Sequence, residues 1–312
     1  MMRKARLAGS WYPASEAACR RFVDEALSGF DPPSLPREPL VGAIAPHAGW
    51  RYSGRLAARV IATIGRVASP KTILCFGAVH VPGVWNSAVF AKGAFSTPLG
   101  PVEVDRELAS AISEAARGVV EIDPEPHLGE HSIEVLVPFI AALLPSARIV
   151  PILVPPSAKT VELGVACALA AGGSDVTAIA STDLTHYGLE AYGFAPAGEG
   201  EDALRWAKDE NDRRFIDLCL KLDAESVVTE ARERRNACGP GAVAALLAYA
   251  RERGAKKGVL LGHSTSFEEE TRLTGRSASA MEPDLFVGYA GIVFLAEGST
   301  AKGNSLPPAA SI

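Results

Sequence analysis

Short apolar runs of strand length alternate with longer amphipathic segments along most of the chain, and this alternation limits the folds open to it. The runs expected to form strands are 40–45, 71–77, 86–91, 147–154, 175–180, 258–263 and 287–296. Helical spacing separates them at 54–67, 104–117, 132–144, 157–171, 201–220, 224–232 and 240–253. Continuous apolar runs are typical of strands buried on both faces, which helices must then cover. The sequence therefore predicts an α/β fold, a single three-layer domain in which a mixed, largely parallel sheet lies between helices.

Composition suggests where this domain ends. No linker-like stretch interrupts residues 3–297, so we expect one domain over residues 1–298. Residues 299–312, STAKGNSLPPAASI, are small, polar and proline-containing, which is typical of a disordered tail. Pro151 interrupts one apolar run, and because proline cannot donate to a sheet ladder, that strand is expected at an edge or a bulge.

Charge and composition argue against several classes of protein. With 31 basic and 36 acidic residues the formal net charge is -5, which disfavours a nucleic-acid-binding surface. No apolar segment follows the basic N-terminus as in a signal peptide, and the longest apolar stretch, 135–144, is too short to span a membrane. We therefore expect a cytoplasmic protein without a membrane partner. Neither a GxGxxG after a strand nor a P-loop is present, so no nucleotide cofactor is indicated.

Histidines and an acid follow three of the expected strands. His47 and His80 each come after one apolar run, and Asp183 and His186 come after another. In open α/β sheets, ligands bind in the crevice at the carboxyl ends of the strands. Polar residues at three equivalent positions favour a shared site over isolated loop residues. A histidine there can transfer protons near neutral pH and an acid can orient it, so we predict His186 and Asp183 as the catalytic pair.

Cys238 differs from the other four cysteines because it lies in a polar loop, NACGPG, before an expected helix. The five cysteines are scattered without a CxxC pair, so neither a disulfide framework nor a zinc ribbon is indicated. A helix N-terminus and a nearby cation would lower the pKa of Cys238 and favour the thiolate. Two imidazoles and one thiolate suit a mononuclear transition-metal site, if His47, His80 and Cys238 meet in space. The alternative is an inert thiol in a turn.

The segment 127–131 reads HLGEH, which matches the H-x-x-E-H pattern of one class of zinc peptidases. That pattern requires a helix, whereas Pro126 precedes the segment and Gly129 lies inside it. A zinc peptidase is therefore disfavoured. We expect residues 130–132 to cap the next helix and to place His131 in the cleft.

Two residues that follow His47 closely are candidate ligand contacts. Arg51 and Tyr52 place a cation beside an aromatic ring, a combination that suits an aromatic or anionic ligand. Together with His131, they are the predicted substrate-binding residues.

Six short motifs follow one another along nearly the whole chain. They are RLAGSWYP at residues 6–13, APHAG at 45–49, EHSIE at 130–134, STDLTHYG at 181–188, NACG at 236–239 and VGYA at 287–290. In this order they resemble the Memo family, also called AmmeMemoRadiSam system protein B. The family usually reads Gly-Pro-Ser-His where this chain has Gly-Ala-Val-His at residues 77–80.

The resemblance implies a fold like that of class III extradiol dioxygenases of the LigB type. It also implies that His47, His80 and Cys238 are the metal ligands, with Asp183 and His186 beside them. The implied cofactor is a single iron or copper ion, with zinc also compatible, and the implied chemistry is redox. Implied partners are a radical-SAM protein and an AMMECR1-like protein, and animal relatives are tied to signalling and phosphopeptide binding.

Three functions therefore stay open. The leading hypothesis is a metal-dependent oxidoreductase of unknown substrate. The second is a peptide- or anion-binding module, or a signalling scaffold, that uses the same cleft. The third is a LigB-type ring-cleaving dioxygenase or a metal-dependent hydrolase, which is disfavoured because extradiol cleavage uses two histidines and a carboxylate, where this chain would place a thiolate.

Overall fold

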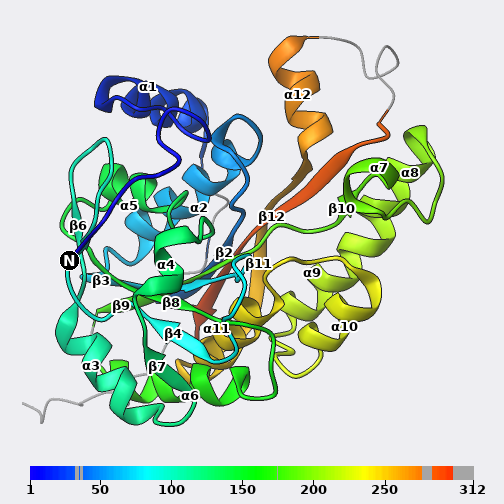
Figure 1. The fold of residues 1–312 in the computed structure, drawn as a ribbon. Helices are drawn as coiled ribbons and strands as arrows, with labels where there is room; N and C mark the ends of the chain where they lie inside the picture. The colour runs from blue at the N-terminus through cyan, green and yellow to red at the C-terminus, as the bar shows by residue number, and fades with distance from the viewer. Residues whose placement is uncertain (32–34, 36–37, 174, 276–282, 298–312) are drawn as a thin grey trace, which may run out of the picture.

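The computed structural model describes residues 1–297 except 32–34, 36, 37, 174 and 276–282, and a large mixed sheet lies at its centre (Figure 1). The strands of this sheet are β2 (Leu40–Ala45), β3 (Thr72–Gly77), β4 (Ser87–Val89), β7 (Val120–Ile122), β8 (Arg148–Leu153), β9 (Val176–Ser181), β10 (His186–Tyr187), β11 (Ala255–Thr265) and β12 (Phe286–Ala296). Their order is β10-β12-β2-β9-β3-β8-β4-β7, with β11 paired to β12.

The middle of the sheet is parallel and its flanks are antiparallel. Strands β2, β9, β3 and β8 run in the same direction, whereas β12 is antiparallel to β2 and β4 is antiparallel to β8. Because β2 and β3 both pair with β9, the carboxyl ends of three neighbouring strands lie at one edge. The predicted mixed, largely parallel sheet is confirmed.

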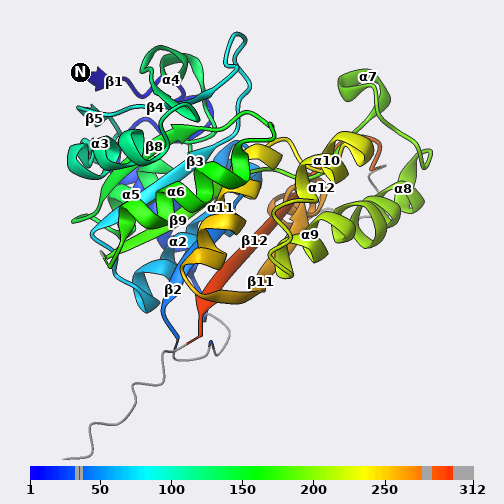
Figure 2. The ribbon, with the colours of Figure 1, turned by 90° about the horizontal axis from the view of Figure 1, so that it is seen from below.

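Helices cover both faces of the sheet, as the continuous apolar runs require (Figure 2). One face packs against α3 (Arg106–Ala115), α6 (Thr160–Ala171) and α11 (Pro240–Glu252), and the other packs against α1 (Glu16–Leu27), α2 (Arg55–Val67) and α5 (Val137–Leu143). Along β3, Leu74 and Phe76 belong to the first core, and Ile73 and Cys75 belong to the second. The predicted three layers are confirmed.

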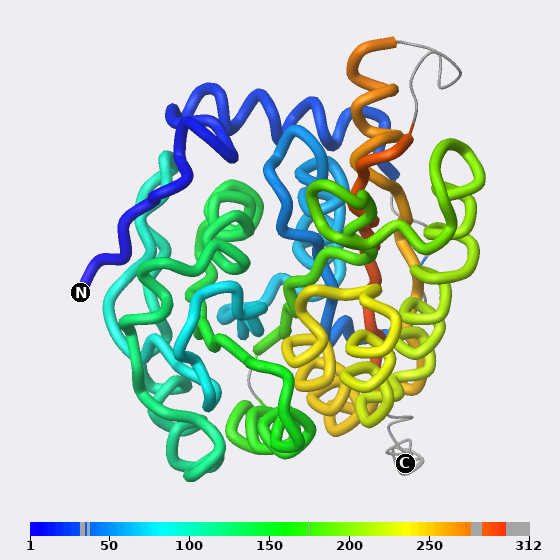
Figure 3. Tube along the Cα trace, turned by 45° about the vertical axis from the view of Figure 1, so that its right-hand side comes forward, coloured from blue at the N-terminus to red at the C-terminus, as the bar shows by residue number. Residues whose placement is uncertain are grey.

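Two further groups of elements surround this sandwich. At the end of the sheet formed by β10, β12 and β11 lie α7 (Leu189–Tyr192), α8 (Gly200–Trp206), α9 (Arg213–Leu220), α10 (Val227–Arg234) and α12 (Ser266–Thr274), as Figures 1 and 2 show. The π-helix η2 (Ala207–Asp212) joins α8 to α9. At the N-terminus, β1 (Met2–Arg3), β5 (Ala94–Phe95) and β6 (Val102–Glu103) form a small sheet, so the first residues run beside the 94–103 hairpin (Figure 3).

Two local expectations are wrong. Strand β8, which contains Pro151, lies between β3 and β4 and not at an edge, and its pairing with both strands shows no register shift that would mark a bulge. It tolerates the proline because pairing with β4 involves Ile152 and Leu153, while the Pro151 carbonyl accepts from the Phe90 N–H. The helix expected at 132–144 begins only at residue 137, with a proline in its first turn, where proline is best tolerated.

Other expectations concern features that the structure leaves untested. The tail predicted at 299–312 lies outside the described residues. Within the described part of the chain, no helix is both long and apolar enough to cross a membrane. The cytoplasmic location and the single domain over 1–298 stay predictions.

Substitution of the buried Trp50 would measure how much the core on the α2 and α5 side of the sheet contributes to stability. Its ring is 1% exposed, stacks on Phe139 at a centroid distance of 3.9 Å and donates from Nε1 to the Val135 carbonyl. We expect Trp50→Ala to lower the free energy of unfolding by about 3–5 kcal/mol in urea titrations. The matched control is Trp85→Ala, because Trp85 is 85% exposed and its loss is expected to cost less than about 0.5 kcal/mol. Equal losses would contradict this assignment.

The buried Glu269 predicts a pH dependence of stability. It joins α12 to α2 through hydrogen bonds from Arg55, and Arg272 donates to it as well. Burial alone would raise the pKa of Glu269, but these arginines hold it below its usual value of 4.5. A carboxyl with a lowered pKa stabilises the fold above its unfolded pKa, and this stabilisation is lost as the pH falls.

We therefore expect Glu269→Gln to be less stable than the wild type at pH 7 by about 1–3 kcal/mol. Its urea midpoint should also change less than that of the wild type between about pH 5 and pH 3. Glu190→Gln, at an exposed position, is the control. Identical pH profiles for wild type and Glu269→Gln would refute the assignment.

Candidate metal centre

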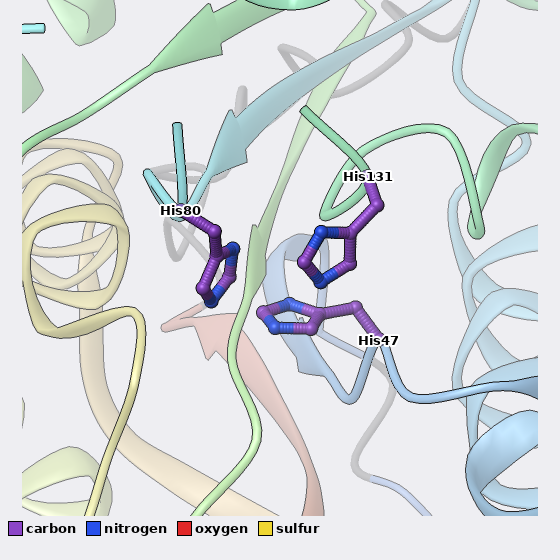
Figure 4. A group of neighbouring side chains, drawn as sticks. All are labelled: His47, His80 and His131. Carbon is purple, nitrogen blue, oxygen red and sulfur yellow. The ribbon is translucent and has the colours of Figure 1, made fainter. Parts of the chain in front are cut away.

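Three histidine rings meet at the carboxyl edge of the sheet (Figure 4). His47 follows β2, His80 follows β3, and His131 follows the short helix α4 (Glu125–Gly129). The ring centroid of His80 lies 5.1 Å from that of His47 and 4.4 Å from that of His131, and the centroids of His47 and His131 lie 5.4 Å apart. One ring nitrogen of each histidine lies within 4.8 Å of the others, so this cluster is able to hold a metal ion.

The hydrogen bonds of His47 determine which nitrogen it presents. Its Nδ1 lies 2.7 Å from the Ser181 hydroxyl, which donates its one hydrogen to the Ser132 carbonyl 2.6 Å away. Ser181 must therefore accept from His47 Nδ1–H, which leaves the lone pair on Nε2. Burial, followed by the charges of His80 and His131, lowers the pKa of His47 well below its usual value. The ring is thus neutral and presents Nε2 as a ligand.

His80 is oriented by a buried carboxylate in the same manner. Its Nδ1 lies 2.9 Å from Glu130, which also accepts from the backbone N–H groups of His80, His131 and Ser132. Burial alone would raise the pKa of Glu130, but these hydrogen bonds and the charge of His80 hold it well below its usual range. An ionised acceptor makes Nδ1 of His80 the donor, so a neutral His80 ring would present its lone pair on Nε2.

His131 was predicted as a substrate contact, and it lies inside the cluster. Its ring packs against those of His80 and Trp11, with centroid distances of 4.4 and 4.8 Å. Burial, followed by the charge of His80, lowers the pKa of His131 to about 4, so the ring is neutral. No local sequence signal identifies it as a ligand candidate, because the contact that places it joins Glu130 to the loop of His80, 50 residues away in the sequence.

Cys238 lies beside His47. Its Sγ is 3.2 Å from His47 Nε2, and the Asp183 N–H donates to the sulfur at 3.3 Å. Among the described residues, the group of ligand atoms that all lie within 4.8 Å of one another does not include it. Burial, followed by the charge of Asp183, raises the pKa of Cys238, so the predicted lowering is wrong for the protein residues alone. Only a cation among its neighbours would reverse this sign.

Asp183 and His186 both line the cavity beside the cluster. Asp183 Oδ1 accepts from the His47 N–H at 2.7 Å, and burial raises the pKa of Asp183 to about 6. His186 Nδ1 lies 2.9 Å from the Leu184 carbonyl, so this nitrogen carries the hydrogen. The ring orientation of His186 thus comes from a backbone carbonyl and from an edge contact with Tyr192 at 5.0 Å.

The HLGEH segment does not form the helix that a zinc peptidase needs. Helix α4 ends at Gly129, and Glu130 is extended. His127 is buried outside the cluster, with Nε2 bonded to the Ala88 carbonyl. Arg3, 1% exposed, donates to the carbonyls of His127 and Glu130 and thereby fastens this segment to the N-terminus.

A cavity of about 610 Å³ extends from the cluster toward α12 and the start of β12. Six aromatic rings line it: Trp11, Tyr52, Tyr192, Phe267, Phe286 and Tyr289. Its acidic lining residues are Asp183, Glu270 and Asp284. Of the two predicted contacts near His47, Tyr52 lines the cavity, whereas the exposed Arg51 is not among the lining residues and donates to both oxygens of Glu270.

These features define an α/β protein in which three histidines that could hold a metal ion cluster at the carboxyl edge of a mixed sheet. The family described as Memo-like protein matches residues 3–292, and the chain belongs to this family. MEMO1 family proteins of Thermococcus kodakarensis, Thermococcus onnurineus and Pyrococcus abyssi are 38%, 36% and 36% identical to it, each over 94% of this chain and 99% of the relative. An uncharacterized Escherichia coli K12 protein, JW3007, overlays on 81% of this chain and 99% of its own at 14% identity, with a TM-score of 0.49.

Gly239, directly after Cys238, lies very close to the end of β9. A Cβ at this residue would lie 2.4 Å from the Ser181 carbonyl oxygen, so only glycine lets the start of α11 approach β9 so closely. We expect Gly239→Ala to lower the free energy of unfolding by about 1–3 kcal/mol in urea titrations, because backbone must shift to make room. Gly173→Ala is the control, since nothing lies within 4 Å of its Cβ position. A Gly239→Ala variant as stable as this control would disprove the close approach.

Proposed function

We propose that the chain is a metal-dependent oxidoreductase in which His47 and His80 hold a single iron or copper ion beside the aromatic cavity. The observation that carries this proposal is the convergence of imidazoles whose outer nitrogens are already bonded, to Ser181 in one case and to Glu130 in the other. Such outer partners fix the tautomer and ring orientation of a metal-binding histidine. The donor set fits a transition metal, because imidazole suits iron, copper and zinc.

The third ligand distinguishes two forms of this proposal. Either His131 completes a three-imidazole set, or Cys238 supplies a thiolate from the side of His47. Thiolate is the softer donor and favours copper or iron, whereas three imidazoles also suit zinc. A bound iron or copper ion would supply one-electron chemistry and a Lewis acid at the mouth of the cavity.

The protein's own residues would provide binding and proton transfer. His186 would move protons through Nε2, because Nδ1 is held by the Leu184 carbonyl. Asp183 would hold the His47 backbone in place through its bond to that N–H. Tyr52 and the other rings would orient an organic substrate and exclude water from the cluster.

The alternatives have less support. A peptide- or anion-binding module that uses Arg51 would need that cation to face the ligand, but its guanidinium is bonded to Glu270. Ring cleavage of the LigB type uses a carboxylate ligand, and the cluster consists of imidazoles. Association with a radical-SAM protein and an AMMECR1-like protein is proposed from the family resemblance alone.

Metal content is the direct test. We expect anaerobically purified protein to contain close to one iron or copper ion per chain by elemental analysis, and His47→Ala to lose at least about tenfold in metal affinity. His186→Gln is the matched control, because it removes a cavity histidine outside the three-ring group and should bind metal as the wild type does. Stoichiometric metal in His47→Ala would sink the proposal.

The same preparation distinguishes the two ligand sets. After replacement of the native ion by cobalt, a thiolate ligand gives a sulfur-to-metal charge-transfer band that Cys238→Ser abolishes. A three-imidazole site lacks this band, and His131→Gln then weakens cobalt binding while Cys238→Ser does not. Weakening by neither substitution would exclude both ligand sets.

A further inference from the structure

The carboxylates that line the cavity have no basic counterpart among its described lining residues, which limits the kinds of ligand that the cavity can bind. Among the described lining residues there are three carboxylates and no lysine or arginine. We propose that the cavity takes an aromatic ligand that carries a cationic nitrogen at the end remote from the three histidines. This inference rests on the proposed function only for the histidine end, where the reacting group of the ligand would lie.

The aromatic part of the ligand follows from the walls. Trp11 and His131 lie at the cluster end, with ring centroids 4.8 Å apart, and Phe267 and Phe286 lie at the α12 end. Tyr289 also lines the cavity and is 1% exposed as a residue. Rings on several sides favour a flat ligand, whose ring can pack in offset or edge-to-face contacts. A volume of about 610 Å³ leaves room for a substituent beyond one ring, since pockets of about 300–1,000 Å³ hold drug-sized molecules.

The cationic part follows from the α12 end. Asp284 lines the cavity just before β12, and one of its oxygens accepts from the Gly200 N–H. Glu270 on α12 lines it as well and receives two hydrogen bonds from Arg51. The charge of Glu270 is thus largely compensated by Arg51, while Asp284 adds negative potential next to Phe286. A cation beside a carboxylate and over aromatic faces is stabilised by both.

The histidine end requires the opposite polarity. A metal ion held by these histidines would repel a cationic nitrogen and would attract an oxygen donor. A hydroxyl oxygen is the group of an aromatic ligand that suits this end. The ligand would therefore lie with its oxygen toward His47 and its nitrogen toward Asp284.

Three small probes of the same ring test this polarity. Tyramine carries an ammonium group, 4-ethylphenol is its uncharged counterpart, and 4-hydroxyphenylacetate carries a carboxylate. We expect full-length protein with measured metal content to bind tyramine at least about threefold more tightly than 4-ethylphenol in ligand-observed NMR titrations, with 4-hydroxyphenylacetate the weakest. Tyramine binding no tighter than 4-ethylphenol binding, or a preference for the carboxylate probe, would overturn the inference.

Two substitutions should move the tyramine to 4-ethylphenol ratio in opposite directions. Asp284→Asn should lower it toward one, and Arg51→Gln should raise it, because the arginine charge beside Glu270 is removed. Glu190→Gln removes an exposed carboxylate outside the lining and should leave the ratio unchanged. An unchanged ratio in Asp284→Asn, with its unfolding temperature close to that of the wild type, would also overturn the inference.

The two proposals fail in different ways. Protein without metal that still prefers tyramine would end the oxidoreductase proposal and leave the ligand polarity standing. Protein with stoichiometric iron or copper that shows no preference for tyramine would end the proposed ligand polarity and leave the oxidoreductase proposal standing.

Discussion

The buried carboxylate of Glu130 accepts hydrogen bonds from the His80 ring and from three backbone N–H groups, and the arrangement of the cluster depends on it. Removing a carboxylate from water is costly unless its lone pairs are satisfied and a partner compensates its charge. Satisfying those lone pairs draws the loop after β3 and the segment after α4 together. Two of the three rings, His80 and His131, are thus placed by one acid, while Arg3 holds the backbone of that acid from the other side.

The third ring is placed by the sheet. His47 follows β2, which pairs with β9, and the last residue of β9, Ser181, accepts from the His47 ring. The Ser181 hydroxyl donates in turn to the Ser132 carbonyl, two residues beyond Glu130. The outer hydrogen bonds of His47 and of the Glu130 loop are therefore connected, so a shift at the end of β9 changes both sides of the cluster at once. Such connected buried networks hold ligands in one orientation when every member is satisfied.

Sequence reasoning succeeded where one physical rule governed the outcome. Buried parallel strands read as continuous apolar runs, and residues after such runs share an edge, which is why His47, His80 and Asp183 lie together. It failed where contacts distant in sequence decide the geometry. No local pattern announces that the Glu130 carboxylate binds the His80 loop and so carries His131 into the cluster. The burial that raises the pKa of Cys238, and the Asp183 charge that adds to it, likewise come from residues distant in sequence.

Because Cys238 lies next to His47, its thiol and a metal ion would compete for the same lone pair, the one on His47 Nε2. With Nδ1 of His47 bonded to Ser181, its Nε2 is able to accept from the Cys238 thiol or to bind a metal ion, but not both. Because burial raises the pKa of Cys238, the thiol keeps its proton while the protein's own residues are its only neighbours. A cation at the cluster opposes this effect, so metal uptake would break the S–H···N contact and favour loss of the thiol proton. Metal affinity would then fall at low pH, whichever of Cys238 and His131 completes the ligand set.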